Sequence, residues 1–234
     1  MKPSNNKVPK HIGIVMDGNR RFAKRLMLKP YKGHEWGAKK VEKIVDWCLE
    51  KNVKELTLYA LSLENFNRPK QEFGYLMNLF RKEFENFKTN PKLRFTKVNF
   101  IGRIKMFPED IQETMNYLMK KTKDNNKFIL NFAMAYGGRA EVIDAIKKLA
   151  KDIKNNKLDI NKINEESFGK NLYMNDEPDL IIRTGGEKRT SNFLIWQSYY
   201  AEWAFLDILF PEFEKEDFLK CLEDYSKRER RFGR

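Results

Sequence analysis

The stretch HIGIVMDGNRRFAKR, residues 11–25, decides the class of fold. It opens with an apolar run at residues 12–16, which has the length of a buried β-strand, and it closes with a short helical pattern at residues 22–25. Between the two lie an acid, a glycine, an asparagine and two arginines. A strand that leads through a polar loop into a helix is the repeating unit of a parallel α/β sheet.

The rest of the chain repeats this alternation. Five further apolar runs have the length of strands, at residues 56–60, 98–101, 128–133, 180–182 and about 204–209. Apolar residues recur at helical spacing in three segments, at residues 41–49, 73–87 and 142–153. No internal repeat or Pro/Gly/Ser-rich linker divides the sequence. We therefore predict an α/β fold, a single domain over residues 1–234 with a central, mostly parallel six-stranded sheet flanked by helices.

The charge balance is strongly basic, with 46 lysines and arginines against 33 aspartates and glutamates and a formal net charge of +13. Such a surplus attracts nucleic acid, anionic membranes and phosphorylated small molecules, and charge alone does not separate them. The first ten residues lack a secretory pattern, and no apolar run reaches the roughly 18 residues that span a bilayer. We expect a cytoplasmic protein and leave peripheral contact with the inner face of the membrane open.

The two cysteines, Cys48 and Cys221, lie in helix-like segments. Small thiols in such segments are usually buried, so we predict neither a disulfide framework nor a cysteine metal site.

Polar loops follow the predicted strands. In a parallel sheet, ligands bind beyond the carboxyl ends of the strands, so these loops are the expected place for a binding site. Three of them combine arginine with glycine or with small hydroxyl or amide side chains: DGNRR at 17–21, SLENFNRP at 62–69 and RTGGEKRTSN at 183–192. The pattern predicts an anion site that several loops build together.

The first loop combines Asp17 with donors for a phosphate. Gly18 allows the backbone to come close, and Arg20 and Arg21 each offer a planar fork of N–H groups. Asp17 would repel a bare phosphate, but a Mg²⁺ ion between the two removes the conflict. The alternative is that Asp17 caps the following helix. A P-loop is a weak match, because Asn19 stands where that motif needs lysine.

Two other loops extend the predicted site. Ser62 and Asn65 fit turn caps by themselves, but that interpretation leaves Arg68 unexplained. Arg183 and the arginine and serine that follow it could together hold a diphosphate.

Glu202 lies among apolar residues in YYAEWAF. An unpaired carboxylate there is costly, and either a metal ion or a structural ion pair with an arginine would relieve the cost.

Taken together, five segments resemble the cis-prenyltransferases, the undecaprenyl diphosphate synthase family. They are HIGIVMDGNRRFAK, GHEWGAKKVEKIVDWC, TLYALSLENFNRP, AMAYGGRAEVIDA and DLIIRTGGEKRTSNFLIWQSYYAEWAF, in that order, followed by a terminal RERRFG. The resemblance covers nearly the whole chain. The stretches PYKGHEWGAKKVEKIVDWC and AMAYGGR look more like the archaeal branch than the bacterial one. The Asp-Asp pair that marks trans-type prenyl synthases does not occur in the sequence.

The resemblance implies a Mg²⁺-dependent homodimer that condenses isopentenyl diphosphate onto an allylic diphosphate primer, farnesyl or geranylgeranyl diphosphate. The product would be a long-chain cis-polyprenyl diphosphate, the precursor of a glycosyl carrier lipid. An apolar tunnel for the growing chain is expected, lined by Phe128, Met134 and the aromatic-rich helix at residues 71–88.

The resemblance also assigns roles to residues of this chain. Asp17 and Asn65 would be catalytic, and Asp17 and Glu202 would hold the metal. The substrate-binding residues would be Gly18, Asn19, Arg20, Arg21, Phe22, His34, Ser62, Leu63, Glu64, Phe66, Arg68, Arg183, Arg189, Thr190 and Ser191. Within this set, His34 would hydrogen-bond phosphate, although a lone histidine is more often a packing or surface residue.

Two other functions stay open from the residues alone. A non-catalytic subunit of a two-protein prenyltransferase would tend to lose its acidic and arginine residues, yet Asp17, Asn65 and Arg183 are present. A nucleic-acid-binding protein would explain the positive charge, but the sequence contains no helix-turn-helix, RNP-like or zinc-finger pattern. We therefore expect no nucleic-acid partner.

Overall fold

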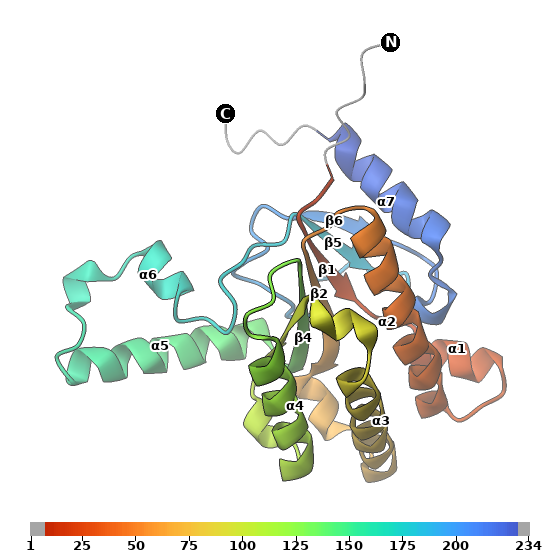
Figure 1. The fold of residues 1–234 in the computed structure, drawn as a ribbon, viewed down its shortest axis with the longest axis horizontal. Helices are drawn as coiled ribbons and strands as arrows, with labels where there is room; N and C mark the ends of the chain where they lie inside the picture. Colours follow the sequence, from red (N-terminus) through yellow and green to blue (C-terminus); the bar gives the residue numbers. More distant parts are fainter. Residues whose placement is uncertain (1–7, 229–234) are drawn as a thin grey trace.

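A sheet of six strands forms the centre of the protein in a computed structural model that describes residues 8–228 (Figure 1). In chain order the strands are β1 (His11–Val15), β2 (Glu55–Ser62), β3 (Thr96–Ile101), β4 (Phe128–Tyr136), β5 (Leu180–Arg183) and β6 (Glu202–Phe205). Their order in the sheet is β3-β4-β2-β1-β5-β6, and all five pairings are parallel. The predicted α/β class and the six-stranded sheet are confirmed.

Helices connect the strands. The α-helices of the described residues are α1 (Asn19–Arg25), α2 (Gly33–Glu50), α3 (Lys70–Lys88), α4 (Glu109–Thr122), α5 (Gly138–Lys154), α6 (Glu165–Gly169) and α7 (Lys215–Lys227). Single turns of 3-10 helix lie between them: η1 (Pro30–Lys32), η2 (Leu63–Asn67), η3 (Pro91–Arg94), η4 (Ile104–Met106), η5 (Ile160–Lys162) and η6 (Phe210–Glu212).

Two apolar clusters join helices to the sheet. In the first, the inner faces of α2 and α7 pack against the middle strands, with Ile44 and Phe218 fully buried. In the second, α3 and α4 pack against β3 and β4 around Phe84 and Met115. Cys48 and Cys221 are buried free thiols, as predicted. Figure 1 also shows α5 and α6 extending away from the sheet as an arm.

Two elements differ from the sequence prediction. The sixth strand was expected at about 204–209 but occupies Glu202–Phe205, because after Phe205 the chain leaves the sheet and covers the loop that follows β5. There the backbone N–H groups of Gly185 and Gly186 donate to the carbonyls of Ile208 and Leu206. Helix α4 was not predicted, although Ile111, Met115 and Leu118 recur on one face and are buried.

The order of the strands creates one favoured binding position. From β1 the chain proceeds to β2 on one side, whereas from β5 it proceeds to β6 on the other. The connections that leave the neighbouring strands β1 and β5 therefore run in opposite directions, and a crevice opens where such connections part. Asp17 follows β1 and Arg183 ends β5, so both lie at this point. Among residues 8–228, no helix has the length and hydropathy needed to cross a membrane.

Candidate active site

One cavity of about 640 Å³ opens at the carboxyl edge of the sheet. The loops after β1, β2 and β5 supply its polar wall, as the sequence predicts for a ligand site in a parallel sheet. Most of the polar residues that line it belong to the predicted set: Asp17, Asn19, His34, Ser62, Glu64, Asn65, Arg68, Arg183 and Ser191. The structure thus brings together residues that lie more than 160 positions apart in the sequence.

Asp17 is held between two guanidinium groups. Arg183 Nη2 donates to its Oδ2 at 3.0 Å, and Arg21 Nη2 donates to its Oδ1 at 3.1 Å. The Asp17 side chain is about one-third exposed, so it is accessible from the cavity. It does not cap α1, where the cap position belongs to Gly18 and receives no side-chain hydrogen bond. The helix-cap alternative for Asp17 is therefore wrong.

Arg183 is the most deeply buried cation of the site, with its side chain only 3% exposed. Besides Asp17, it donates to Ser191 Oγ at 2.7 Å and to the backbone carbonyl of Arg189. Its Nε is buried and has no hydrogen-bond partner among the described residues. A buried donor without an acceptor is unfavourable, and this one belongs to a side chain that borders the cavity.

Two glycines allow the loops after β1 and β5 to pack closely against each other and against the segment around Leu209. Gly18 has φ of 112°, and a Cβ there would lie 2.9 Å from Leu209. Gly185 has φ of 93°, and a Cβ there would lie 2.5 Å from Arg21 Nη2 and 3.1 Å from Asp17. Both backbone angles are left-handed, a region that suits glycine. A side chain at either position would displace the Asp17 loop.

A second charged group lies at the start of α2 and α3. Arg68 Nη1 donates to Glu72 Oε1 at 3.0 Å and lies 3.4 Å from His34 Nε2. Arg20 Nε lies 3.5 Å from the same Glu72 oxygen. Burial, Arg68 and Arg20 lower the pKa of His34 to about 4, so its imidazole is neutral at pH 7. Burial likewise lowers the pKa of Arg68.

Glu72 was missed from the sequence. Its side chain is 6% exposed, and it anchors two of the arginines that were predicted to bind substrate. The available signal was its spacing: Glu72 lies one helical turn after Arg68, just inside a helix that begins after Pro69. A buried acid at that spacing holds its arginine in place.

Ser62 and Asn65 form a tight turn at the end of β2. The Ser62 backbone N–H donates to Asn65 Oδ1 at 3.2 Å, which confirms that Asn65 caps this turn. Both residues also line the cavity. A capped turn and an exposed polar face are therefore compatible at this position.

Away from these loops the cavity wall is mostly apolar, with Glu42, Glu83, Asn90 and Lys92 as polar exceptions. Its apolar part comes from α2, α3 and the middle strands: Val41, Val45, Leu76, Leu79, Phe80, Phe84, Phe87, Leu130 and Phe132. The aromatic-rich helix was predicted for this wall and does line it. Phe128 and Met134 were also predicted, but both are fully buried, and Leu130 and Phe132 of the same strand take their place.

Several predicted residues lie outside the cavity wall. Leu63 and Phe66 pack in the apolar cluster of α3 and α4, and Phe66 contacts the rings of Phe73 and Phe107. The Phe22 ring packs edge-on against Trp36. Gly18, Arg20, Arg21, Arg189 and Thr190 lie near the cavity without lining it.

Arg189 and Glu202 each form an ion pair within the described residues. Arg189 is 61% exposed, and its guanidinium donates to Glu187 Oε2 at 2.7 Å. Glu202 pairs with Leu180 across the sheet, level with Ile12, which is the amino edge and not the carboxyl edge where Asp17 lies. Glu202 accepts a hydrogen bond from Arg228. Within one chain Glu202 thus forms the structural ion pair and does not join Asp17.

A metal site built by this chain alone is absent from residues 8–228, where no three Asp, Glu, His or Cys side chains cluster suitably. Asp17 nonetheless fits Mg²⁺, which commonly binds one protein carboxylate together with the phosphates of a substrate. The terminal RERRFG lies largely outside the described residues.

Comparison with known proteins identifies the type of site. A family model described as "Putative undecaprenyl diphosphate synthase" matches residues 15–233. A tritrans,polycis-undecaprenyl-diphosphate synthase (geranylgeranyl-diphosphate specific) from Methanopyrus kandleri is 45% identical, over all of this chain and 88% of the relative. A protein of the same name from Methanocaldococcus jannaschii is 45% identical over 97% of this chain and 83% of its own length. The archaeal character of the sequence is confirmed.

Solved structures agree with these matches. Lavandulyl diphosphate synthase from Lavandula x intermedia, in complex with dimethylallyl diphosphate, has a TM-score of 0.91 at 32% identity and covers 97% of this chain and 99% of its own. A probable undecaprenyl diphosphate synthase from Campylobacter jejuni has a TM-score of 0.82 at 32% identity, covering 97% and 100%. The predicted transferase activity is confirmed over the two alternatives, and the chain belongs to the undecaprenyl diphosphate synthase family of cis-prenyltransferases.

Proposed function

We propose that this enzyme elongates geranylgeranyl diphosphate with isopentenyl diphosphate units, in a Mg²⁺-dependent reaction, to a long-chain cis-polyprenyl diphosphate that serves as a carrier-lipid precursor. One observation carries the proposal: a single cavity joins a guanidinium-lined end at Asp17 and Arg183 to an apolar wall from α2 and α3. A diphosphate with a hydrocarbon tail matches that division. The archaeal relatives, named for geranylgeranyl diphosphate, favour the twenty-carbon primer over farnesyl diphosphate.

The polar end would hold the leaving diphosphate. Arg183 and Arg21 now share the Asp17 carboxylate, and phosphate oxygens would offer both guanidinium groups new acceptors. The unpartnered Nε of Arg183 would gain one as well. Preorganised donors at the place where charge develops stabilise the transition state of such a departure.

Asp17 would then be available for a metal. When bound there, Mg²⁺ would neutralise charge on the departing diphosphate, which makes ionisation of the allylic carbon easier. We assign the metal to Asp17 and substrate phosphates. Glu202 is not part of this assignment, because it lies at the opposite edge of the same chain.

The remaining polar residues would orient the second substrate. Arg183, Arg189, Thr190 and Ser191 belong to the loop after β5, and we assign them to the isopentenyl diphosphate. Ser62 and Asn65 face the cavity from the β2 turn, where they would guide loss of the proton after the new bond forms. Because the pKa of His34 is about 4, its neutral ring would act as a hydrogen-bonding partner of phosphate and not as a cation.

We also propose that the enzyme is a homodimer. Large apolar side chains are exposed on the arm and beside it, including Ile143 and Ile146 of α5 and the nearby Tyr199, which is 64% exposed. Several large exposed apolar side chains in one region commonly mark a protein interface. Sedimentation analysis of the wild type and of Ile146→Glu tests this: we expect a dimer and a shift toward monomer, and a monomeric wild type would contradict it.

The primer assignment has a direct test. The purified enzyme is incubated with labelled isopentenyl diphosphate and Mg²⁺, together with a ten-, fifteen- or twenty-carbon allylic diphosphate. We expect long-chain product with the highest kcat/KM for the twenty-carbon primer. Preference for the fifteen-carbon primer would overturn the primer assignment alone, and failure to extend any primer would overturn the proposed function.

A further inference from the structure

Six consecutive residues at the end of the first helix and in the turn that follows it are exposed: Lys24, Arg25, Leu26, Met27, Leu28 and Lys29. The three apolar side chains are 46%, 95% and 38% exposed in that order, so Met27 is almost completely in solvent. Figure 1 shows α1 and the turn after it at the edge of the molecule, on the opposite side from the α5 and α6 arm. Three adjacent apolar side chains between basic ones form a small convex tip, which we call the 24–29 tip.

The backbone of the tip is ordered. The N–H of Leu28 donates to the Ala23 carbonyl at 2.9 Å, and the N–H of Met27 donates to the Lys24 carbonyl at 3.0 Å. This is the Schellman pattern that ends many helices, and its left-handed position usually holds glycine. Here that position is Met27, with φ of 56°. The chain therefore keeps a strained backbone at a position whose side chain gains almost no burial, which stability alone does not favour.

The charged residues of the segment that carries the tip are all basic, although Glu187, Asp207 and Glu212 of other loops lie near its α1 side. Between Gly18 and His34 the sequence holds six lysines and arginines and no acid. Arg25 is paired with Glu212 at 2.9 Å, but within residues 8–228 neither Lys24 nor Lys29 has an ion-pair partner. Lysines on either side of exposed apolar side chains complement a lipid surface, because its headgroups are anionic and the layer beneath them is apolar.

We propose that the 24–29 tip docks this protein on an anionic lipid surface, with Leu26, Met27 and Leu28 inserted between headgroups and Lys24 and Lys29 against lipid phosphates. Shallow insertion of apolar side chains, supported by attraction to anionic lipid, is the general mode of interfacial binding. The proposal concerns a surface that is separate from the cavity, and its physical basis does not depend on the proposed substrates.

The place of the tip gives the docking a consequence. Helix α1 has seven residues, with Arg20 and Arg21 in its first turn and the tip at its end. Trp36, which is 36% exposed and packs against Phe22 of α1, adds an aromatic side chain on the same flank. Docking would therefore hold the mouth of the cavity near the lipid where a hydrocarbon substrate or product partitions.

A protein partner fits the tip less well. Stable protein interfaces bury roughly 1,000 Å² or more, usually over a broad patch with an apolar centre. The tip is a single tight turn ringed by cations, whereas the broader exposed apolar surface of the molecule lies on α5 and its neighbours. Shape and charge together thus favour lipid over a second copy of the chain.

Flotation with vesicles tests the proposal. The full-length protein is mixed with vesicles of phosphatidylcholine alone, or with one-third phosphatidylglycerol, at low and moderate salt. We expect binding to the anionic vesicles that weakens with salt. Met27→Gly removes the exposed side chain and suits the left-handed backbone, so it should fold at least as well as the wild type. The double variant Leu26→Gln/Met27→Gly should lower the partition coefficient roughly tenfold or more.

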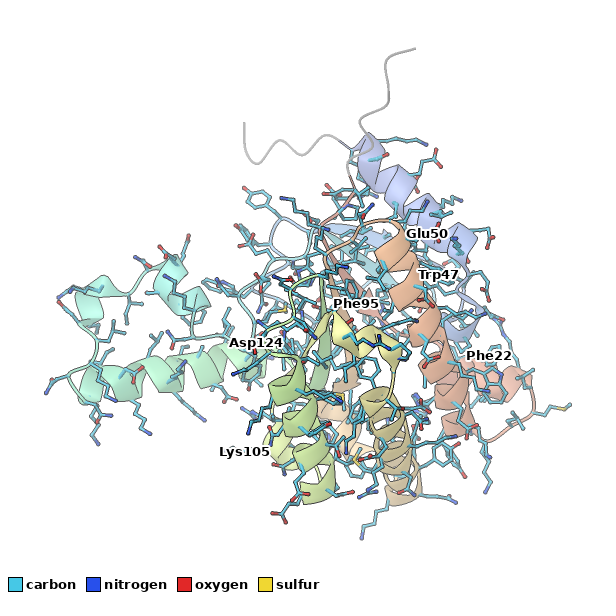
Figure 2. All side chains as sticks on the ribbon, viewed as in Figure 1. Phe22, Trp47, Glu50, Phe95, Lys105 and Asp124 are labelled. Atoms are coloured by element: carbon cyan, nitrogen blue, oxygen red, sulfur yellow. The ribbon has the colours of Figure 1, made fainter. Side chains whose placement is uncertain are left out.

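A matched control lies on the other side of the molecule. Lys105 and Met106 of η4 are also an exposed lysine and an exposed methionine, and Figure 2 labels Lys105 far from Phe22. Lys105→Gln/Met106→Ser should leave binding unchanged. Wild-type protein that does not bind anionic vesicles would overturn the proposal. So would equal losses in both double variants, or a change of oligomeric state in Met27→Gly without any change in vesicle binding.

Discussion

The two ends of the sheet hold polar side chains in opposite ways. At the carboxyl end, Asp17 and Arg183 face a cavity, and within residues 8–228 the arginine keeps a buried donor without a partner. At the amino end, Glu55, Thr57 and Asn131 lie beneath the surface and bond to one another across neighbouring strands. One end is arranged to receive a ligand, and the other is largely closed on itself.

The amino-end network illustrates what a structural polar cluster needs. Asn131 Nδ2 donates to Glu55 Oε1 at 2.6 Å and to Thr57 Oγ1 at 2.9 Å, and Asn99 Nδ2 donates to Asn131 Oδ1 at 2.8 Å. His11 Nε2 lies 2.8 Å from Thr57 Oγ1. These bonds run from β1 through β2 and β4 to β3 and fix the register of the strands. Burial is therefore compatible with polarity where the partners are internal.

This contrast explains how a site is distinguished from a scaffold in this fold. Both ends contain buried charge or amide groups, so burial alone does not mark function. The difference lies in whether the polar groups border a cavity: Asp17 and Arg183 line one, whereas Glu55, Thr57 and Asn131 do not. Four experiments sharpen the comparison, from the largest expected effect to the smallest.

Substitution at the carboxyl end should abolish turnover. Asp17→Asn keeps the shape of the side chain but removes the charge that we assign to the metal. We expect kcat to fall at least ~10³-fold, because stabilisation of the departing diphosphate is lost. The melting temperature should also fall, because the buried Arg183 loses its carboxylate partner, so the rate is measured below the unfolding transition. Steady-state incorporation of labelled isopentenyl diphosphate measures the rate, and near wild-type turnover would contradict the assignment.

Substitution of Glu72, which pairs with Arg20 and Arg68, should reduce activity less than substitution of Asp17. Glu72→Gln removes the negative charge that holds Arg20 and Arg68, so both guanidinium groups would be less well placed for a diphosphate. We expect kcat/KM for the allylic primer to fall roughly 10–100-fold, with most of the change in KM. Glu83→Gln, on the same helix and at the far wall of the cavity, is the control. Equal effects of the two variants would refute a positioning role for Glu72.

At the amino end, substitution should affect stability and spare the chemistry. Asn131→Ala leaves the Glu55 carboxyl and the Asn99 amide without their partner, which should lower the free energy of unfolding by about 2–3 kcal/mol. Denaturant unfolding measures the loss. Below the unfolding transition, kcat should stay within twofold of the wild type. A large loss of turnover in a folded protein would break the division between the two ends.

The pH dependence of stability offers the finest test. Burial raises the pKa of Glu55 to about 7 and lowers that of His11 to about 4. The neutral Glu55 carboxyl thus contributes stability that is complete below its ordinary pKa of about 4.3 and is lost as the pH rises through 7. His11 contributes stability that is complete above about 6.5 and is lost as the pH falls through 4. Between about pH 4 and pH 7, the Glu55 contribution to the free energy of unfolding therefore falls as the pH rises, whereas the His11 contribution increases.

Glu55→Gln should separate the two contributions. The amide keeps an acceptor for Asn131 but does not titrate, so the loss of stability between pH 5 and 8 should disappear and the rise due to His11 should remain. Unfolding free energies of the variant and the wild type across this range provide the measurement. Parallel pH profiles of the two proteins would show that Glu55 is ionised throughout and that its burial has no such effect.

Much of this organisation was predictable from the sequence. Apolar runs that end in DGNRR and in RTGGEK indicated parallel strands with binding loops, and the loops do meet at one cavity. The strand order was not predictable, because register depends on contacts between segments far apart in the chain. The roles that the family resemblance suggests for individual residues remain assignments to be tested.

The differences between the expected and the observed positions of these residues have identifiable physical causes. Glu202 stands at the start of a strand, and in a parallel sheet that position lies at the opposite edge from Asp17. Glu72 was missed because an acid on a helix is usually a solvated residue, and only the fold reveals that it is buried between two arginines. Phe128 fits an apolar wall by composition, but core and cavity wall are chemically alike along β4.

Calorimetric titration of inorganic diphosphate tests the central claim most directly, with and without Mg²⁺, on the wild type and on Asp17→Asn. We predict that Mg²⁺ strengthens binding to the wild type, and that the variant still binds diphosphate through its arginines but has lost the metal dependence. An Asp17→Asn protein whose affinity responds to Mg²⁺ as the wild type does would contradict the claim.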